Sequence, residues 1–554
     1  MSVRGAVVMS EPSAVAELPP APHPGSQQMP RWNIGKLPEP PKVTWRTLAL
    51  LLGPGLVSGG AAIGAGEWLA GPAVTARYGA AMLWLATLSI LGQVVYNFEI
   101  SRYTLYSGEP IFTGKFRSLP GPRFWLIAYL FLDFGSVFPY AAAGASTPLA
   151  AVILGDLPNA ASNDINVSIL GIGLTDQALM RLLAYVLFLA ALTPLVFGGK
   201  VYNSLKALMT FKIVAVLGFL LVIAALYSKP DTWSQIFSGF FKFGTIPVSA
   251  ADAPTASGYA TDNVFVSLWE GRGFPQLDWS MVAMLAALAS IAGSGGLTNT
   301  ALSGYTRDQG WGMGKHVGAI PSAVGGRKIA LSHMGTVFHV TAESLRRWKG
   351  WLRHVGRDQL IVWMPACFIG IALPSMLSVQ FLQRGTEVDK WRIAVMTADG
   401  VRDTVGSQWG NLFWYGVMLC GFLVLSTTMA STADGILRRW VDVFWTSSPR
   451  LRKWDSKGIR KLYFFVLCGY AAFGVTTLTL MPKPGELLEW ATNIYNYALG
   501  FSCWHALYVN MTLLPKELRP GWLSRIGLVM AGTFFACLAV MSTLDLLGIV
   551  KAAQ

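Results

Sequence analysis

The stretch GGAAIGAGEWLAGP, from Gly59 to Pro72, places five glycines and one carboxylate, Glu67, inside an apolar segment. Glycine weakens a helix by up to about 1 kcal/mol per residue relative to alanine, so the cluster predicts an interrupted helix. Backbone groups freed inside a membrane are tolerated only where they line a cavity or bind something. Close packing of small residues would explain the glycines. It would not explain the acid, which is therefore a candidate functional group.

The composition indicates a polytopic α-helical membrane protein. Of 554 residues, 53% are hydrophobic and 13% are charged, which is too little charge for the surface of a soluble protein of this length. Apolar runs long enough to span a bilayer recur, and the short alternating segments of a membrane barrel are absent. The net charge of +14 is concentrated in particular loops, which fits the positive-inside bias better than a nucleic-acid partner. None of the five cysteines has CxxC spacing, so neither a disulfide framework nor a zinc site is predicted.

Residues 1–44 are rich in proline and lack the apolar core of a signal peptide, so we expect a disordered cytoplasmic tail. Residues 45–554 are expected to form one all-α transmembrane transporter domain. Its eleven predicted segments are 47–76, 79–106, 124–154, 178–198, 204–227, 279–305, 359–382, 409–437, 461–481, 486–513 and 524–549.

Basic residues gather in alternate connections: before the first segment, between the second and third, in 307–358, and between the eighth and ninth. Lysine and arginine mark cytoplasmic loops, so the N-terminus is predicted inside and the C-terminus outside, in the cell (inner) membrane. The long connection 228–278 then lies outside. The basic connection 307–358 is expected to rest on anionic lipid headgroups, and binding a partner or regulation is the alternative.

A second glycine-rich stretch, ASIAGSGGLTNTALSGY at 289–305, carries Ser294, Thr298 and Asn299 in the sixth segment. If the first ten predicted segments are divided into two sets of five, this segment is the first of the second set. Gly59–Pro72 lies in the first segment of the first set. Two glycine-interrupted helices at matching positions indicate a transporter site built on inverted repeats. The repeats are expected at about 47–227 and 279–513, with 524–549 as an extra helix.

Other polar residues lie inside the predicted segments. Asp133 suits a proton route or a hydrogen-bonded structural acid, and both interpretations stay open. Glu99 and Arg102 are spaced for an i,i+3 ion pair. The hydroxyls of 426–432 suit either a wet path or bonds to their own backbone carbonyls. Bonds between helices are expected for three further side chains: Asn493, Asn496 and His505.

Over most of residues 45–545 the chain resembles the Nramp family of divalent-metal transporters. The likeness is carried by GPG at 53–55 followed by the interrupted helix, by LW at 83–84, by the acid Asp133, and by STTMASTADGILRRW at 426–440, which is similar to the family's QSST…G helix. The resemblance implies the LeuT-type fold, with broken helices 1 and 6.

The metal-binding motifs of that family are not retained. Its D-P-G-N motif falls on Gly64, Ala65, Gly66 and Glu67, so only the glycine is kept, and Ser136 replaces a second acid of the third helix. Its M-P-H motif is replaced by GSGGLTN at 293–299. The soft thioether ligand that favours later transition metals is therefore absent. The remaining donors are oxygens, which suit a hard cation such as Mg²⁺ that keeps bound water. They equally suit Na⁺, or a proton, coupled to a small organic solute.

The predicted function is secondary active transport by alternating access. The favoured cargo is a divalent cation, and its transport could be coupled to protons. Glu67 is the predicted central charge, either as a ligand of the metal or as a proton acceptor, and Asp133 is a candidate for the proton route. The predicted binding residues are Gly64, Ala65, Gly66, Glu67, Ser294, Thr298 and Asn299.

The alternatives are an ion-coupled symporter of a small organic solute, such as an amino acid, and a membrane sensor that signals through 307–358. No phosphate loop, nucleophile elbow or HExxH motif is present, so an enzyme is not predicted. The expected partners are membrane lipid and the small cargo, with no cofactor and no nucleic acid. The sequence does not predict an oligomeric state.

Overall fold

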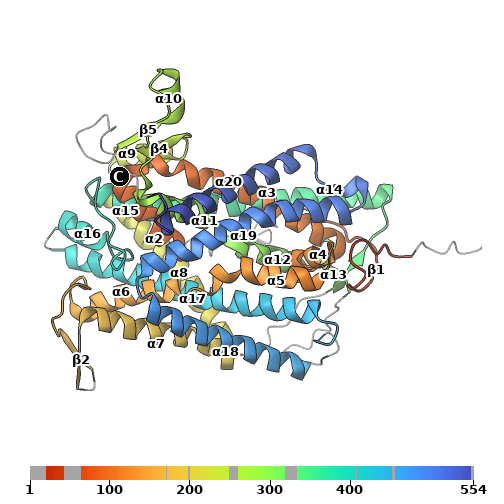
Figure 1. The fold of residues 1–554 in the computed structure, drawn as a ribbon, viewed down its shortest axis with the longest axis horizontal. Coiled ribbons are helices and arrows are strands. Elements are labelled where there is room, and N and C mark those ends of the chain that lie inside the picture. Colours follow the sequence, from red (N-terminus) through yellow and green to blue (C-terminus); the bar gives the residue numbers. More distant parts are fainter. Residues whose placement is uncertain are drawn as a thin grey trace, which may run out of the picture.

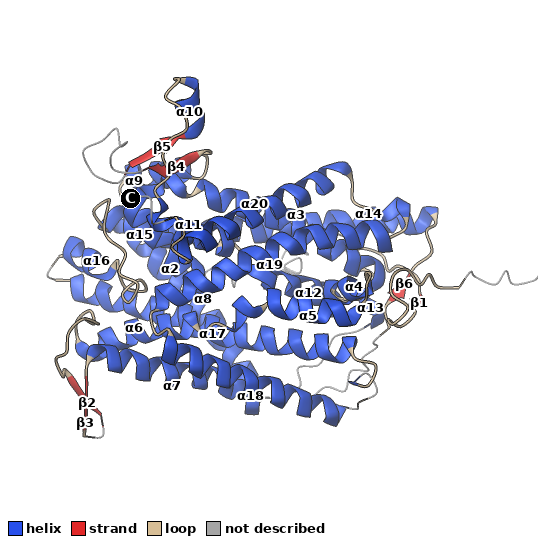
Figure 2. Ribbon diagram, viewed as in Figure 1, coloured by secondary structure: helices blue, strands red, loops and turns tan. Residues whose placement is uncertain are grey.

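The structure is a computed structural model that describes residues 20–42, 64–169, 171–197, 200–248, 260–317, 334–406, 408–451, 454 and 456–550. Helices make up most of this part of the chain, and the strands form short two-stranded pairs at its ends (Figures 1 and 2). The described pairs are β1 with β6, β2 with β3, and β4 with β5.

The first half of the chain, up to the connection 228–278, contains α2 (Ala65–Tyr78), η2 (Gly79–Met82), α3 (Trp84–Ser107), α4 (Ile111–Arg117), α5 (Pro122–Leu132), η3 (Phe134–Val137), α6 (Tyr140–Leu154), α7 (Asp176–Phe197) and α8 (Lys200–Tyr227). The connection itself contains α9 (Pro230–Gly239), β4 (Thr245–Val248), β5 (Ala260–Asn263) and α10 (Val264–Trp269). The other strands are β1 (Asn33–Ile34), β2 (Val167–Ile169), β3 (Ile172–Leu174) and β6 (Thr336–Val337).

The second half contains η5 (Trp279–Met281), α11 (Val282–Ile291), η6 (Gly296–Thr300), α12 (Ala301–Asp308), α13 (Gly314–Val317), α14 (Ala342–Arg357), the π-helical turn η7 (Asp358–Trp363), α15 (Met364–Phe381), α16 (Ala398–Val405), α17 (Gly410–Ser447), α18 (Ser456–Leu480), α19 (Pro484–Leu513), η9 (Lys516–Leu518) and α20 (Trp522–Leu546).

Each predicted transmembrane segment contains helix within the described residues. By length and composition alone, seven described helices could cross a membrane, or eight if α2–η2 and α3, which meet at 94°, count as one span. The predicted segments at α8 and α19 are also helical, although they fall outside that count. Residues 47–63, which hold GPG and most of the first glycine cluster, lie outside the described residues.

The connections separate to the two ends of the bundle. At one end of the long axis lie α9, α10, α16 and the hairpins β2–β3 and β4–β5; at the other lie α4, α13, α14 and β1 (Figure 1). These groups correspond to the connections that the charge pattern predicts on opposite sides of the membrane. The assignment of the α4–α14 end to the cytoplasm stays a prediction, and that end is called the inner end below.

The third segment is not the continuous helix that the apolar run 124–154 predicts. It consists of α5, η3 and α6, interrupted between Asp133 and Pro139. Pro139 has no amide to continue the helical ladder. Gly135 lies so close to α19 that a Cβ there would be 2.6 Å from the carbonyl oxygen of Ala491. The apolar run identified the segment, but the break follows from packing against α19.

The prediction of a disordered tail is wrong for residues 20–42, called here the N-terminal strap. Its β1 pairs in parallel with β6. The Arg117 guanidinium donates to the carbonyl of Pro30 at 2.7 Å and lies 4.8 Å from the ring centre of Trp32. Met29 is 2% exposed and packs in a cluster that includes Leu297 of η6. Ordering this segment costs conformational entropy, and its composition alone predicts that this cost keeps it disordered. The burial of its apolar side chains offsets the cost.

The described parts of the basic connection 307–358, residues 307–317 and 334–358, contain helices and a short strand. Its helix α14 runs through η7 into α15, so the seventh span is continuous with a helix at the inner end. One face of α14 is buried through Trp348 and Trp351, and the Trp351 indole donates to the carbonyl of Pro38 at 2.9 Å. Its exposed face carries four cations: Arg346, Lys349, Arg353 and Arg357.

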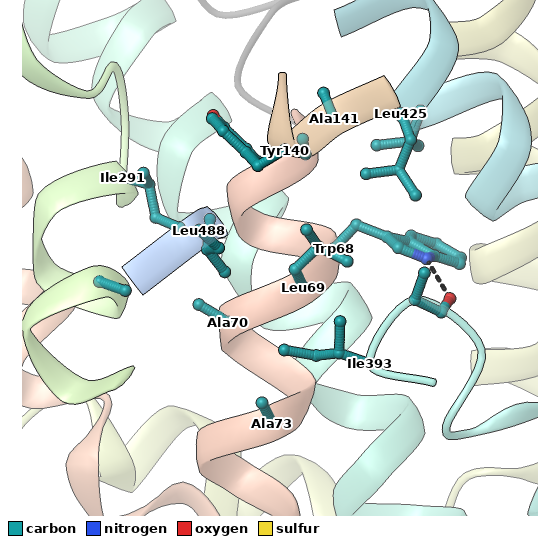
Figure 3. Close-up of a cluster of buried hydrophobic side chains, with 14 of the residues drawn as sticks. Trp68, Leu69, Ala70, Ala73, Tyr140, Ala141, Ile291, Ile393, Leu425 and Leu488 are labelled. Carbon is teal, nitrogen blue, oxygen red and sulfur yellow. Dashed lines mark hydrogen bonds between the residues drawn. The ribbon is translucent and has the colours of Figure 1, made fainter. Parts of the chain in front are cut away.

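Helix α2 is buried in the bundle along its whole length, except at Arg77. Figure 3 shows Leu69 and Ala70 of α2 among side chains from several other elements. The Trp68 indole donates to the carbonyl of Ala394 at 2.9 Å, which fixes α2 to the segment before α16. The side chains drawn around it are Tyr140 and Ala141 from α6, Ile291 from α11, Leu425 from α17, Leu488 from α19, and Ile393 (Figure 3).

Candidate functional site

Glu67 connects the two glycine-rich segments that the sequence singles out. It lies in the first turn of α2, where Gly64 is the N-cap. Its Oε2 accepts a hydrogen bond from the Gly64 amide at 3.0 Å, and its Oε1 accepts one from the Gly293 amide at 3.4 Å. The residue is 3% exposed. The positive end of the α2 dipole and the two amides therefore stabilise a carboxylate where α2 meets the break after α11.

Three further residues, Gly64, Ala65 and Gly66, occupy the positions that align with the D-P-G-N motif, and they shape the backbone around Glu67. Gly64 contributes its amide, and Ala65 is buried, at 1% exposed. Gly66 allows α2 to approach the end of α11, because a Cβ there would lie 2.5 Å from the Cβ of Ile291. Gly66, the one motif residue that is retained, is thus required by helix contact.

The sixth segment is interrupted where the glycines predict it. Helix α11 ends at Ile291, and the chain resumes helical structure at Gly296. Gly293 has φ +117° and Gly296 has φ +58°, a left-handed region that side chains rarely adopt. A Cβ on Gly293 would also lie 2.9 Å from the Trp363 ring. The prediction of an interrupted sixth helix is confirmed.

Gln93 of α3, which the sequence analysis missed, holds this interruption in place. It is fully buried, and its Oε1 accepts from the Ser294 amide at 3.0 Å and from Asn299 Nδ2 at 2.9 Å. Its Nε2 donates to the Ala292 carbonyl at 3.0 Å. Thr298 donates its hydroxyl hydrogen to the Gly295 carbonyl. The predicted oxygen donors therefore also support the break itself.

Lys212 of α8 is the second residue that the sequence analysis missed. It is 5% exposed, and the charges of Lys212 and Glu67 interact electrostatically. The signal was available in the sequence, since a lysine interrupts the apolar run LMTFKIVAVL in the fifth segment. Two titratable but ordinarily neutral groups, the Tyr140 phenol and the Cys367 thiol, also interact electrostatically with Glu67.

Asp133 is bound in an ion pair. Arg439 of α17 donates to both of its oxygens, at 2.8 and 2.7 Å, and the Trp440 indole donates at 2.6 Å. Ser136, which stands where the family has a second acid, donates to Asp133 at 2.7 Å. The hydroxyl of Tyr495 interacts with Ser136 and also with Tyr140. Polar groups therefore connect Asp133 with Tyr140, which interacts electrostatically with Glu67.

Other polar side chains have structural roles, of which the Glu99–Arg102 pair and the bonds between elements were expected, whereas two interpretations had been left open for the α17 hydroxyls. Glu99 and Arg102 form their ion pair at 2.8 Å. The α17 hydroxyls of Ser426, Thr427 and Thr428 donate to carbonyls of their own helix. The bonds between elements run from Asn493 to Thr543, from Asn496 to the Ala286 carbonyl, and from His505 to Ser118 and Tyr129.

The donor set around Glu67 contains a single acid. In the described part of the chain, no group of three or more His, Cys, Asp or Glu side chains is placed to hold a metal ion. The five cysteines are free thiols. Any cation bound at Glu67 would therefore take its other ligands from backbone carbonyls, hydroxyls, the Asn299 amide oxygen or water.

No protein-family model and no curated protein matches this chain. A solved structure of the manganese transporter of Eremococcus coleocola, in complex with an aromatic bis-isothiourea substituted compound, matches with a TM-score of 0.55 and 12% identity, covering 93% of this chain and 91% of that one. Two mutants of that transporter match with TM-scores of 0.54 and 0.52, at 12% and 13% identity, each over 94% of this chain and 92% of that one.

The chain has the LeuT-type transporter fold. This likeness confirms the predicted fold class. The described helices that are long and apolar enough to cross a membrane agree with a multi-pass integral membrane protein. The matched proteins are transporters and not enzymes. At this level of identity the likeness concerns the fold, so membership of the Nramp family stays a prediction.

Proposed function

We propose that the chain is a secondary active transporter that moves a cation by alternating access, with Glu67 as the central charge. The observation that carries the proposal is the position of Glu67, whose two oxygens accept amides from both glycine-rich segments. Rearrangement of either repeat changes this contact, so charge and conformation are linked at one group.

A divalent cation is the proposed cargo. The manganese transporter of the same fold supports this class, and the oxygen donors around Glu67 suit a hard cation that keeps some of its water. An anionic solute on this fold would need free amides at the start of a half-helix. The Gly64 and Gly293 amides donate to Glu67 instead, and this arrangement favours a cation over an amino acid.

Asp133 is proposed as part of a proton route. The groups that connect it with the centre are Ser136, Tyr495 and Tyr140. Because Asp133 is paired with Arg439, its carboxylate becomes a proton acceptor only when α17 moves away from η3. The cytoplasmic position of the strap and of α14 is proposed from the basic residues of that end.

The test is uptake into proteoliposomes of purified protein, screened with Mg²⁺, Mn²⁺, Ca²⁺ and Na⁺, with and without a proton gradient. Glu67→Gln is expected to abolish uptake of the transported cation, because it removes the one acid at the junction. The matched control is Glu489→Gln, a similarly buried acid that pairs with Lys390. Unchanged uptake by Glu67→Gln, or equal loss in both variants, would contradict the assignment.

A further inference from the structure

The exposed face of α14 carries a row of cations at helical spacing. Its members, called here the basic stripe, are Arg346, Lys349, Arg353 and Arg357. At 3.6 residues per turn these positions fall within an arc of about 80° around the helix. Among the described residues, no hydrogen bond or ion pair involves a side chain of the stripe. The four charges therefore point away from the bundle with no acid beside them to neutralise them.

The opposite face of α14 holds the stripe in position. Trp351 is 4% exposed, and Arg347 on the flank donates to the carbonyl of Leu37 in the N-terminal strap at 2.6 Å. The first turn is capped by the Thr341 hydroxyl, which accepts from the Ser344 amide at 3.1 Å. A ligand that binds the stripe therefore meets a helix that is already ordered, and little backbone entropy is lost on binding.

The stripe ends where the exposed apolar surface of a membrane span begins. Helix α14 continues through η7 into α15 as one helix of 40 residues that is apolar enough to cross a membrane. Leu360 and Ile361, within about one turn of Arg357, are 51% and 67% exposed. Apolar side chains exposed on a spanning helix face the hydrocarbon, so Arg357 lies at its edge. At 1.5 Å per residue, Arg353 is about 6 Å and Arg346 about 16 Å further out.

We propose that Arg353 and Arg357 bind the phosphate of an anionic phospholipid at the inner end of α14. The polar layer of a bilayer is about 5–8 Å thick on each side, so these two cations reach the phosphodiester. Lys349 and Arg346 lie beyond that layer and add only long-range attraction. Side chains four residues apart are neighbours on a helix, so two guanidinium groups can bind one phosphate together. The proposal goes beyond transport and holds whatever the cargo is.

A lipid fits this surface better than a free phosphate or a soluble polyanion. One phospholipid supplies a phosphate for Arg353 and Arg357 and acyl chains for Leu360 and Ile361, in the order in which the helix presents them. A free phosphate would make no use of the exposed apolar residues. An acidic protein or a nucleic acid would use the whole stripe, including the end furthest from the hydrocarbon. Charge and apolar surface together therefore favour the membrane.

The test follows thermal unfolding of the purified full-length protein in a non-ionic detergent during titration with dioleoylphosphatidylglycerol. Dioleoylphosphatidylcholine is the zwitterionic comparison, and it should raise the midpoint only at higher concentration. Arg353→Gln/Arg357→Gln should raise the phosphatidylglycerol concentration for half the effect by about tenfold or more, because each cation near an anionic surface contributes about fivefold in affinity. Arg346→Gln/Lys349→Gln should raise it by about threefold or less, because these cations lie beyond a Debye length of about 8–10 Å.

Two further variants and one soluble probe complete the test. Lys229→Gln/Lys242→Gln removes two exposed cations beside α9, at the opposite end of the bundle, and should leave the titration unchanged. Arg353→Lys/Arg357→Lys keeps both charges and should keep most of the affinity, which separates a lost site from a misfolded variant. A wild-type titration for Arg353→Gln/Arg357→Gln would overturn the proposal. Equal losses for the two halves of the stripe would overturn it in favour of a soluble polyanion, and equal stabilisation by glycerol phosphate would overturn it in favour of a free phosphate.

Discussion

Gly66→Ala tests the contact between the two glycine-rich segments most directly. The added methyl would lie 2.5 Å from the Cβ of Ile291 and 2.7 Å from its Cγ1. Non-bonded carbons prefer about 3.5–4.0 Å, so one half-helix must move by roughly 1 Å. No rotamer change relieves a clash with a Cβ. Overpacking costs about 1–3 kcal/mol, and the helix preference of alanine returns at most about 1 kcal/mol. We expect a net loss of about 2 kcal/mol in the free energy of unfolding.

The assay is tryptophan-monitored unfolding of the purified protein in detergent. Gly218→Ala on α8 is the control, because a Cβ there meets nothing within 4 Å; its stability should be unchanged or slightly raised. Ile291→Gly should partly rescue Gly66→Ala, because it removes the Cβ that the new methyl would meet. The double variant should then be more stable than the sum of the single losses by about 1 kcal/mol or more. A Gly66→Ala variant as stable as wild type, or strict additivity with Ile291→Gly, would refute the proposed contact.

Three further outcomes are expected. Asp133→Asn should lower the free energy of unfolding by about 3–5 kcal/mol, because it leaves the buried Arg439 side chain unpaired. Adding Arg439→Met should recover part of this loss. An Asp133→Asn variant with the wild-type midpoint of thermal unfolding would contradict the prediction. Burial lowers the pKa of Lys115, on α4 between the spans, to about 7, so between pH 7 and roughly 10 the unfolded chain binds one proton more than the folded chain. The stability of the protein should therefore rise with pH across that window. Lys115→Met should remove this rise in a pH series of unfolding midpoints, and an unchanged slope would count against the assignment. Trp32→Ala should free the N-terminal strap and speed tryptic cleavage after Arg31 by about tenfold or more, because it removes the 3%-exposed ring beside Arg117; equal cleavage rates would reject this packing.

Local patterns in the sequence were sufficient to predict the transmembrane segments and the break in the sixth helix. An apolar run of bilayer length must form a helix in lipid, and Gly293 and Gly296 adopt backbone angles that other residues avoid. The bonding of the α17 hydroxyls to their own carbonyls is likewise set by residues within one helical turn. These features depend on neighbours in the chain, so composition and spacing reveal them.

The order of the strap could not be read from those patterns, and the break in the third segment only in part. Pro139 is a local signal for a break, but the close approach of Gly135 to α19 has no signal in the local sequence. The composition of residues 20–42 predicts disorder, and only the surface formed by α4, α14 and β6 gives Met29 and Trp32 a place to be buried. In both cases a distant surface overrides the local preference.

The sequence by itself determined that Glu67 is a carboxylate inside a glycine-interrupted membrane segment, and that such a group needs compensation. Only the tertiary structure decided what compensates it. The Gly293 amide is 226 residues away, and the Lys212 charge comes from another helix. Gln93, which holds the second interruption, bonds to Ser294 across 201 residues. Contacts at such separations are set by how the helices pack, and no local period in the chain encodes them.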